Sequence, residues 1–362
     1  MSMKSCFVFL TSVSFAAVAC MPPVAAHAPS GEASPAGPAP AGRDPAIQAL
    51  AAKAAACSFE EGAFDEECDA YKAWSEAEEP FEDGKGDATL VSMLEDADEK
   101  VRLLATKKSP SPAFVEQPAI RQRLRAAFAK EKNEEVRREH VRIFAKMSAK
   151  QPEVVALWQE LAKHPSVEVR HTLGFYLSQP HPAALAVSRT LASDPEARVR
   201  EGALVGIQMA TDFGKNEPAC QALVELLGRE DDLDGHVAWT ASSTYCASVQ
   251  APLLASLLAH TSDAARVDRG VVRYSLAVDA FCREGSLATP DQKRKAFEVA
   301  RRLVDPKVRS NRSSAVKSLA SCDPVAGKTL VAKLAGDKDA SVVREAKEAL
   351  AKLAAPRAPA RK

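Results

Sequence analysis

The sequence has few aromatic residues and lacks the short motifs of metal sites and catalytic centres. Aromatic residues make up 6% of its 362 residues, which is low for β-sheets because strands favour aromatic and β-branched side chains. It contains no C-x-x-C pair, no H-E-x-x-H and no G-x-S-x-G segment, the patterns that mark zinc sites and hydrolytic centres. We therefore expect helices, and no catalytic residue, no metal ion and no cofactor.

Net charge is also absent, because 48 Lys and Arg balance 48 Asp and Glu. This balance gives no reason to expect a nucleic-acid partner. The charges are unevenly distributed, however. Between Cys57 and Glu99 there are 16 acidic residues against Lys72 and Lys85, whereas residues 293–362 hold 18 basic and 7 acidic residues. We interpret the first segment as an acidic cap, and the second either as a solubilising end cap or as a docking surface for acidic partners.

The first residues have the features of an export signal. Lys4 precedes an apolar run from Cys6 to Val18, which is too short to span a membrane as a helix and typical of a signal peptide. The run ends in Ala17-Val18-Ala19-Cys20, which resembles the lipobox of bacterial lipoproteins, with Ala17 where Leu is usual. The resemblance implies lipidation at Cys20 and a place in the bacterial cell envelope, facing the periplasm or the cell surface. An ordinary A-x-A cleavage site is the alternative.

These features divide the chain into five segments. We assign residues 1–19 to the signal peptide and residues 20–47, which are rich in Pro, Ala and Gly, to a disordered tether. Residues 48–86 form the acidic helical cap with a cysteine pair, and helix is expected from about Asp44 to Trp74 with an interruption at residues 58–65. Residues 87–354 are the repeat region, and residues 355–362 are a disordered basic tail.

The repeat region is defined by a Val-Arg pair that recurs about every 35 residues. Asp residues just ahead of these pairs predict helix starts, because Asp accepts hydrogen bonds from the first free N–H groups of a helix. Apolar residues follow at helical spacing, as at Val199, Ala203, Leu204 and Ile207, and a second apolar helix precedes each start. We therefore predict an all-α fold, a solenoid of about eight stacked helical hairpins over residues 87–354 with no sheet.

The repeated Asp and Arg positions resemble those of HEAT repeats, specifically the short bacterial kind, in which both residues recur as a ladder along the stack. Seven regularly spaced guanidinium groups also suit a polyanion, but we favour a structural ladder that bonds to carbonyls or carboxylates of neighbouring turns. A weaker copy at Val237-Ala238 lacks the arginine. The aspartates are Asp98, Asp194, Asp268, Asp305 and Asp339, and the arginines are Arg102, Arg137, Arg170, Arg200, Arg273, Arg309 and Arg344.

Six cysteines remain beyond Cys6 and Cys20, and an even number in an exported chain favours disulfides. We predict Cys57 with Cys68, which closes a short loop in the acidic segment. We also predict Cys220 with Cys246, at the open end of one hairpin, and Cys282 with Cys322 on the next repeat. Pairing of Cys246 with Cys282 is the alternative, because the two occupy matching places on neighbouring helices.

The resemblance to HEAT repeats implies a long curved surface for proteins or peptides. We expect a non-catalytic scaffold of the bacterial cell envelope that binds a protein or peptide partner, is held at a membrane through Cys20, and binds no nucleic acid. One alternative is an enzyme or accessory subunit, because some short HEAT-like repeats are similar to those of phycobilin lyases. A purely structural spacer in the envelope is the other.

Overall fold

The structure is a computed structural model that describes residues 44–60, 63–212, 216–227, 235–244, 246–283, 286, 288–309 and 311–354. All of them belong to one compact unit that begins at Pro40. The expected signal peptide, Cys20, the tether up to residue 43 and the C-terminal tail lie outside the described residues. Within the described part, the fold is all-α, as predicted, apart from one two-stranded hairpin.

The first described segment consists of two helices on either side of this hairpin. Helix α1 (Pro45–Ala55) begins at Asp44, whose carboxylate accepts hydrogen bonds from the N–H groups of Ala46 and Ile47. Strands β1 (Phe59–Glu60) and β2 (Ala63–Phe64) pair antiparallel, and α2 (Asp69–Glu76) follows. The interruption expected at residues 58–65 is therefore this hairpin. Its two-residue strands are too short to show an alternating pattern in the sequence.

Two layers of helices follow, and the chain alternates between them: each A helix is followed along the chain by a B helix of the other layer. The A helices are α3 (Asp87–Leu94), α6 (Pro118–Lys130), α8 (Pro152–Leu161), α10 (Pro182–Leu191), α12 (Glu217–Leu227), α14 (Gln250–His260), α16 (Pro290–Leu303) and α18 (Pro324–Leu334). The B helices are α4 (Glu99–Ala105), α7 (Glu134–Lys146), α9 (Val167–Tyr176), α11 (Ala197–Asp212), α13 (His236–Ser242), α15 (Ala264–Cys282), α17 (Val316–Cys322) and α19 (Ala340–Ala354). Short elements lie between them: α5 (Pro112–Val115) and the 3-10 turns η1 (Glu79–Gly84), η2 (Ala247–Val249) and η3 (Arg312–Ala315).

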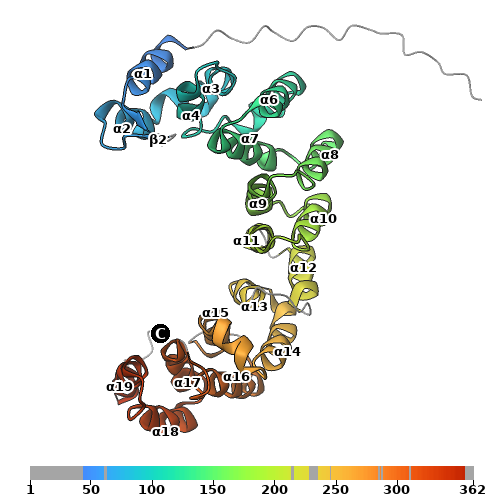
Figure 1. The fold of residues 1–362 in the computed structure, drawn as a ribbon. Coiled ribbons are helices and arrows are strands. Elements are labelled where there is room, and N and C mark those ends of the chain that lie inside the picture. The colour runs from blue at the N-terminus through green and yellow to red at the C-terminus, as the bar shows by residue number, and fades with distance from the viewer. Residues whose placement is uncertain are drawn as a thin grey trace, which may run out of the picture. The chain divides into compact units, whose positions relative to one another are not determined.

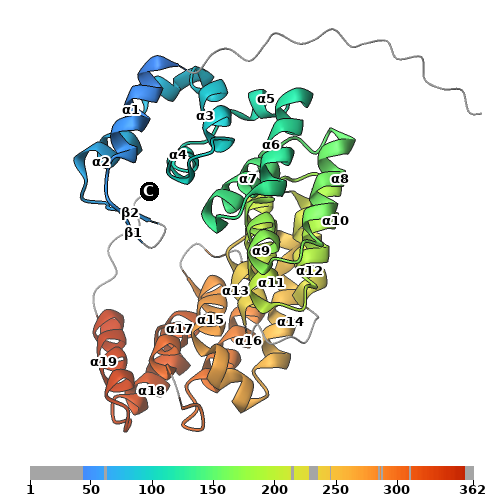
Figure 2. The same cartoon turned by 45° about the horizontal axis from the view of Figure 1, so that its top comes forward.

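Each B helix from α4 to α19 packs against the next B helix along the chain, and α8, α10, α12, α14 and α16 pack in the same way. Figures 1 and 2 show α8, α10 and α12 side by side in one layer and α9 and α11 in the other. The core lies between the layers. Val136, Val169 and Val199, the valines of three predicted pairs, are fully buried there. The Val-Arg period therefore marks the core face of these B helices.

The acidic segment is attached to α4 through aromatic and basic side chains. Trp74 is fully buried, and its indole Nε1 donates a hydrogen bond to the carbonyl oxygen of Leu104 at 2.9 Å. The ammonium groups of Lys100 and Lys108 lie 5.4 Å from the ring centroids of Phe59 and Phe81. Such cation–π contacts are favourable in partly buried positions, so the cap is a packed part of the described unit.

Two of the predicted helix starts are wrong. Asp268 lies inside α15, which begins after Asp263; the carboxylate of Asp263 accepts a hydrogen bond from the N–H of Ala265. Asp305 is followed by a loop, and the next helical turn begins only at Arg312, after Asn311 with a φ of 53°. In both places the Asp precedes a Val-Arg pair, as the sequence pattern requires, but no helix begins at it.

Candidate binding surface

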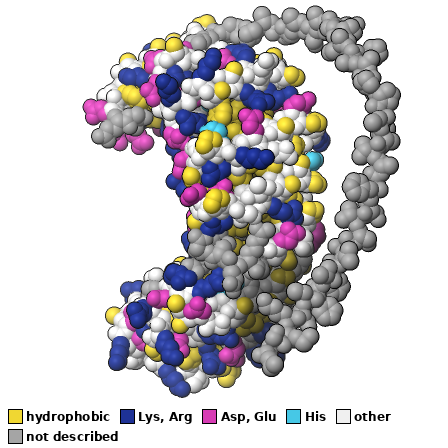
Figure 3. All heavy atoms as spheres, turned by 45° about the vertical axis from the view of Figure 1, so that its right-hand side comes forward, with side chains coloured by type: hydrophobic (Ala, Val, Ile, Leu, Met, Phe, Trp, Pro, Cys, Tyr) yellow, Lys and Arg dark blue, Asp and Glu magenta, His cyan; other side chains and the backbone are white. Residues whose placement is uncertain are grey.

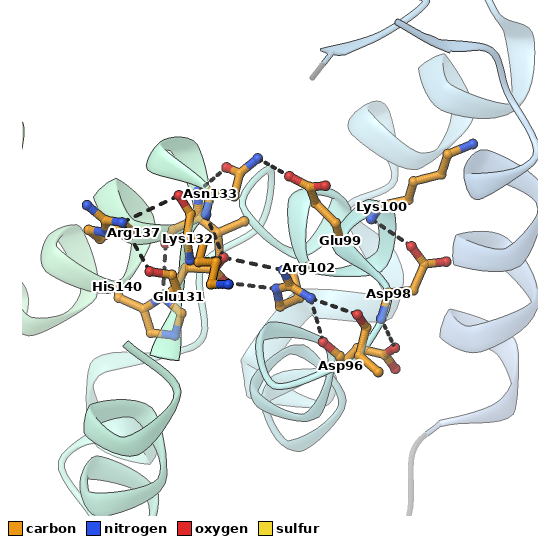
Figure 4. Close-up of polar contacts among 12 residues, drawn as sticks. Asp96, Asp98, Glu99, Lys100, Arg102, Glu131, Lys132, Asn133, Arg137 and His140 are labelled. Atoms are coloured by element: carbon orange, nitrogen blue, oxygen red, sulfur yellow. Dashed lines mark hydrogen bonds and ion pairs between the residues drawn. The ribbon is translucent and has the colours of Figure 1, made fainter. Parts of the chain in front are cut away.

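The described part of the chain contains an arginine ladder between successive units, best seen at Arg102. Its Nη1 donates to the carbonyl oxygens of Asp96 at 2.8 Å and Ala97 at 3.0 Å. Its Nε and Nη2 donate to the carboxylate of Glu131 at 2.7 and 3.3 Å. Figure 4 shows this guanidinium between the loop that precedes α4 and the loop that precedes α7. One side chain thus joins two consecutive units.

Arg170 repeats this geometry two units later. It donates to the carbonyl oxygens of His164 at 2.8 Å and Pro165 at 3.2 Å, and to the carboxylate of Asp194 at 2.8 and 3.1 Å. Arg200 in turn donates to the carbonyl oxygens of Asp194 and Pro195. Each arginine therefore binds the carbonyls six and five positions before it, and Arg102 and Arg170 also bind the side chain at the equivalent position of the next unit. These bonds match the structural ladder that we favoured over a polyanion site.

Three of the seven arginines do not have this geometry. Arg273 lies in the middle of α15, with its Nη2 3.5 Å from the carboxylate of Glu201. Arg309 lies in the loop before η3, and Arg344 is 68% exposed. The place expected for Arg309 is taken by Arg312, which is buried and donates to the carbonyl oxygen of Val304 and to the carboxylate of Asp337 at 2.7 and 3.0 Å.

The carboxylates that the ladder arginines bind, those of Glu131, Asp194 and Asp337, have lowered pKa values. Burial alone raises the pKa of Glu131 and Asp194, but hydrogen bonds from arginine and from backbone N–H groups outweigh it and hold both values below the usual range. The hydrogen bond from Arg312 is the largest effect at Asp337 and lowers its pKa to about 2. These groups therefore favour the folded state in their ionised form.

The lowered pKa of Asp337 predicts a loss of stability in acid. Because its folded value of about 2 lies below the unfolded value near 4, its contribution is complete above about pH 5 and is lost as pH falls towards 2. We expect it to amount to about 2 kcal/mol. Urea unfolding between pH 6 and pH 2 should therefore show a steeper decline for the wild type than for Asp337→Asn. Parallel declines would contradict this assignment.

The ladder is incomplete at Arg137, because the position that holds Glu131 or Asp194 in other units is His164. Arg137 donates to the carbonyl oxygens of Glu131 and Lys132, and His164 Nδ1 accepts the N–H of Ser166, as the carboxylate of Asp194 accepts that of Glu196. Burial, followed by the charge of Arg137, lowers the pKa of His164. A neutral imidazole therefore stands where other units carry an anion.

We expect His164→Asp to stabilise the protein by about 1 kcal/mol. The new carboxylate lies within reach of Arg137 and can still accept the N–H of Ser166, so it completes a partly buried ion pair without breaking the loop. His164→Asn is the matched control, because it keeps the acceptor for Ser166 without the charge. The midpoint of urea unfolding at pH 7 should rise for Asp and not for Asn; equal midpoints for the two variants would show that the missing anion is unimportant.

The six cysteines lie in the three predicted pairs. The Cα–Cα distances are 6.1 Å for Cys57–Cys68, 5.8 Å for Cys220–Cys246 and 4.5 Å for Cys282–Cys322, all within the range that a disulfide allows. Cys220 lies near the start of α12 and Cys246 just beyond α13, at the same end of one helix pair. The alternative, Cys246 with Cys282, is not the pairing in the structure.

The side of the B helices that faces away from the A helices carries a row of polar side chains. Glu168 on α9 pairs with Arg198 on α11, with Oε1 and Nη1 2.6 Å apart. Glu201, one turn further along α11, lies 3.4 Å from Nδ1 of His236 on α13 and 3.5 Å from Nη2 of Arg273 on α15. This polar row crosses four consecutive B helices and fixes their relative register on that side.

An apolar row follows about one helical turn further along the same helices. Residues three or four positions apart share a helix face. Each residue of the apolar row therefore lies on the same face as a polar residue one turn before it. The pairs are His171 and Phe175, Glu201 and Val205, His236 and Trp239, and Arg273 and Leu276. Phe175, Val205 and Trp239 are half-buried, and Leu276 is 50% exposed. We name these four residues the apolar row. It presents aromatic and aliphatic side chains that the fold covers only in part.

In comparisons with known proteins, no protein-family model and no curated protein matches this chain. Within the described ranges, no helix is long and apolar enough to cross a membrane, and no group of three or more His, Cys, Asp or Glu side chains is placed to hold a metal ion. The function has to be argued from the chain's own surfaces.

The described part of the surface includes two depressions that are open to solvent. The larger, of about 560 Å³, lies over α12 and α14 and is lined by Ser256 and His260 among others. The Ser256 hydroxyl donates to the carbonyl oxygen of Leu227 at 3.1 Å, and its oxygen lies 3.4 Å from Nδ1 of His260. Because the hydroxyl proton already goes to a carbonyl, this pair is not arranged as a nucleophile and its base.

Sequence reasoning did not find the apolar row. The Val-Arg period identifies the core face of each B helix, and the row lies on the opposite face, where an apolar residue breaks the amphipathic pattern. Phe175, Trp239 and Leu276 each stand three or four positions after a polar residue of that face. Large apolar residues at positions that helical periodicity assigns to solvent are the signal that identifies them.

Proposed function

We propose that residues 87–354 form a HEAT-like α-solenoid of eight helical hairpins, and that the protein is a non-catalytic, protein-binding scaffold of the bacterial cell envelope. The eight pairs run from α3 with α4 to α18 with α19. Arg102, Arg170 and Arg312, each bonded to a carboxylate of the following loop, support a repeated stacking of units. This is the arrangement that the resemblance to HEAT repeats implies.

The apolar row is the observation that carries the binding proposal. Apolar side chains that recur on one open face mark interaction sites more often than scattered exposed residues do, and Trp is enriched among the residues that dominate binding energy. Trp239 is half-buried, whereas the residues on either side of it, Ala238 and Thr240, are buried. A partner that covers the row buries one side chain from each of four consecutive B helices.

Site-specific photo-crosslinking in the native envelope tests this proposal. A photoreactive residue at Ser243, which is exposed just after the end of α13 and one turn beyond Trp239, should give a discrete adduct with a partner protein. The same residue at Ala255, exposed on the A helix α14, is the matched control and should give none. The adduct at Ser243 should weaken at least tenfold in a Trp239→Ala background. Identical adducts at both positions, or none at either, would contradict the binding role.

The cellular location is part of the proposal. Three cysteine pairs at disulfide distance support an oxidising compartment, and the Cys20 segment supports a lipid anchor. We expect Cys20→Ser to release the protein into the soluble fraction after detergent-free lysis, because a single anchor is then lost. The wild type should sediment with membranes in the same fractionation. A variant that still sediments with membranes would place the anchor elsewhere.

A further inference from the structure

Helix α18 is the last A helix among the described residues, and one of its sides has no neighbour there. The A helices α8, α10, α12 and α14 each pack on the A helix that follows, whereas α18 packs on α17 and α19. Exposed residues recur at helical spacing along this side of α18: Val325, Lys328, Thr329, Ala332 and Lys333. We name these five residues the open face of α18. Val325, at 82% exposure, is the most exposed large hydrophobic residue of the described chain.

This end of the chain has an excess of exposed basic side chains. Figure 3 shows Lys and Arg side chains spread over the lower part of the view, where α16 to α19 lie. Five exposed lysines make no ion pair with a described residue: Lys328, Lys333, Lys338, Lys347 and Lys352.

Four of the five carboxylates in residues 323–354 already have partners. Asp323 accepts N–H groups of α18, Asp337 binds Arg312, Asp339 accepts the hydroxyl of Ser341, and Glu345 lies 3.8 Å from Lys317 and 3.9 Å from Arg344. Glu348 is the exposed carboxylate that remains in this segment. The open face of α18 itself contains none.

Helix α2, near the other end of the described chain, has the opposite charge on its exposed side. Tyr71 and Trp74 form its buried side, whereas Asp69, Ala73 and Glu76 are exposed at spacings of four and three, so they share the other side. We name these three residues the acidic face of α2. Neither of its carboxylates makes an ion pair with a described residue; the ion pair of this helix joins Lys72 to Glu67 at 2.7 Å.

We propose that the open face of α18 binds the acidic face of α2 in a second copy of this chain. Lys328 and Lys333 then face carboxylates, and Val325 is covered by the contact. Such complementary charges attract, whereas like charges brought together cost free energy. Two α18 faces therefore repel each other, and so do two α2 faces, so the contact runs head to tail.

A second copy is the occupant because it always carries the matching charge. Within one chain, no ion pair among the described residues joins the two faces. Each contact leaves one face of each kind open, so association continues into rows or closes into a ring. The helices have 8 and 11 residues, so the area of one contact is small and the association is weak. This inference goes beyond the proposed scaffold function and does not depend on the apolar row.

Sedimentation velocity tests the proposal on the mature, disulfide-bonded Cys20→Ser protein, in which no lipid can cause association. The sedimentation coefficient should rise with protein concentration up to about 300 μM in low salt. The rise should disappear at about 0.5 M salt, because salt screens exposed charges. A coefficient that does not depend on concentration would overturn the proposal. A salt effect of equal size at every concentration would also overturn it, because the contact would then lie within one chain.

Charge-reversal variants locate the contact. Lys328→Glu with Lys333→Glu should abolish association, and so should Asp69→Lys with Glu76→Lys, because each variant then has like charges on both faces. An equimolar mixture of the two variants should associate again, since every face then meets an opposite one. A mixture that does not associate, although both variants fold by circular dichroism, would contradict the proposal.

Lys150→Glu with Lys163→Glu is the matched control, because it reverses two other exposed lysines and changes the net charge equally. It should associate as the wild type does; equal loss in this control would show that net charge, and not α18, controls association. If a charge-reversal variant does not fold, Lys328→Gln with Lys333→Gln replaces it and should weaken association at least tenfold. An unchanged association in that neutral variant would exclude the open face of α18.

Discussion

Gly206→Ala is expected to lower the free energy of unfolding by about 3 kcal/mol. A Cβ atom at Gly206 would lie only 2.1 Å from the carbonyl oxygen of Gly174, and that neighbour is backbone on the facing helix α9. Neither atom can move unless a helix shifts, so the cost exceeds the gain of up to about 1 kcal/mol that Ala gives over Gly inside a helix.

Gly336→Ala is the matched control for this change. Its Cβ would meet nothing closer than the carbonyl oxygen of Lys333 at 3.7 Å, an ordinary contact. The control should leave the stability unchanged or raise it slightly, because Ala reduces the freedom of the unfolded chain. Urea titrations followed by circular dichroism at 222 nm compare the two. If Gly206→Ala unfolds at the wild-type midpoint, α9 and α11 do not approach as closely as described.

Arg170→Met should have the second large effect and lower the free energy of unfolding by about 3 kcal/mol. Arg170 and Asp194 have side chains that are 12% and 8% exposed, so Met leaves a carboxylate that is almost buried without its counter-ion. The two carbonyl oxygens of His164 and Pro165 also lose a donor. Removing one member of a buried charge pair costs more than removing both.

A double-mutant cycle tests this reasoning. Asp194→Asn in the Arg170→Met background should recover at least about 1 kcal/mol, because the uncompensated charge is gone while the side chain still accepts the N–H of Glu196. Urea unfolding of the four proteins at pH 7 gives the coupling free energy. Additive effects would show that the two side chains do not interact, which would contradict the ladder geometry.

The sequence predicted the helices and the cysteine pairs because both depend on local spacing. Buried valines recur at a fixed period, and turns between helices bring Cys220 and Cys246 to the same end of a pair. The prediction failed where the Val-Arg pair recurs by chance. Val272-Arg273 lies more than two turns inside α15, because that helix begins at Ala264, after Asp263, and not after Asp268.

The remaining errors concern loops and surfaces. The loop before η3 spans residues 304–311, whereas the loop between α10 and α11 spans only residues 192–196, so Arg312 and not Arg309 reaches the carboxylate of the next unit. No local rule gives the length of that loop. The apolar row depends on the register between neighbouring helices, which contacts such as that of Glu201 with His236 reveal only in three dimensions.

The charge pairs of the ladder have a direction along the chain. In the three ladder pairs, Arg102 with Glu131, Arg170 with Asp194 and Arg312 with Asp337, the arginine comes first, and its carboxylate follows 24 to 29 residues later. During the proposed export the chain emerges N-terminus first, so each of these three hairpins emerges with a cation whose partner carboxylate follows later. The emergence of the next loop neutralises that cation and fixes the hairpin in place. Emergence from the N-terminus thus completes these three junctions in chain order, with the unit of each arginine held by the unit that follows it.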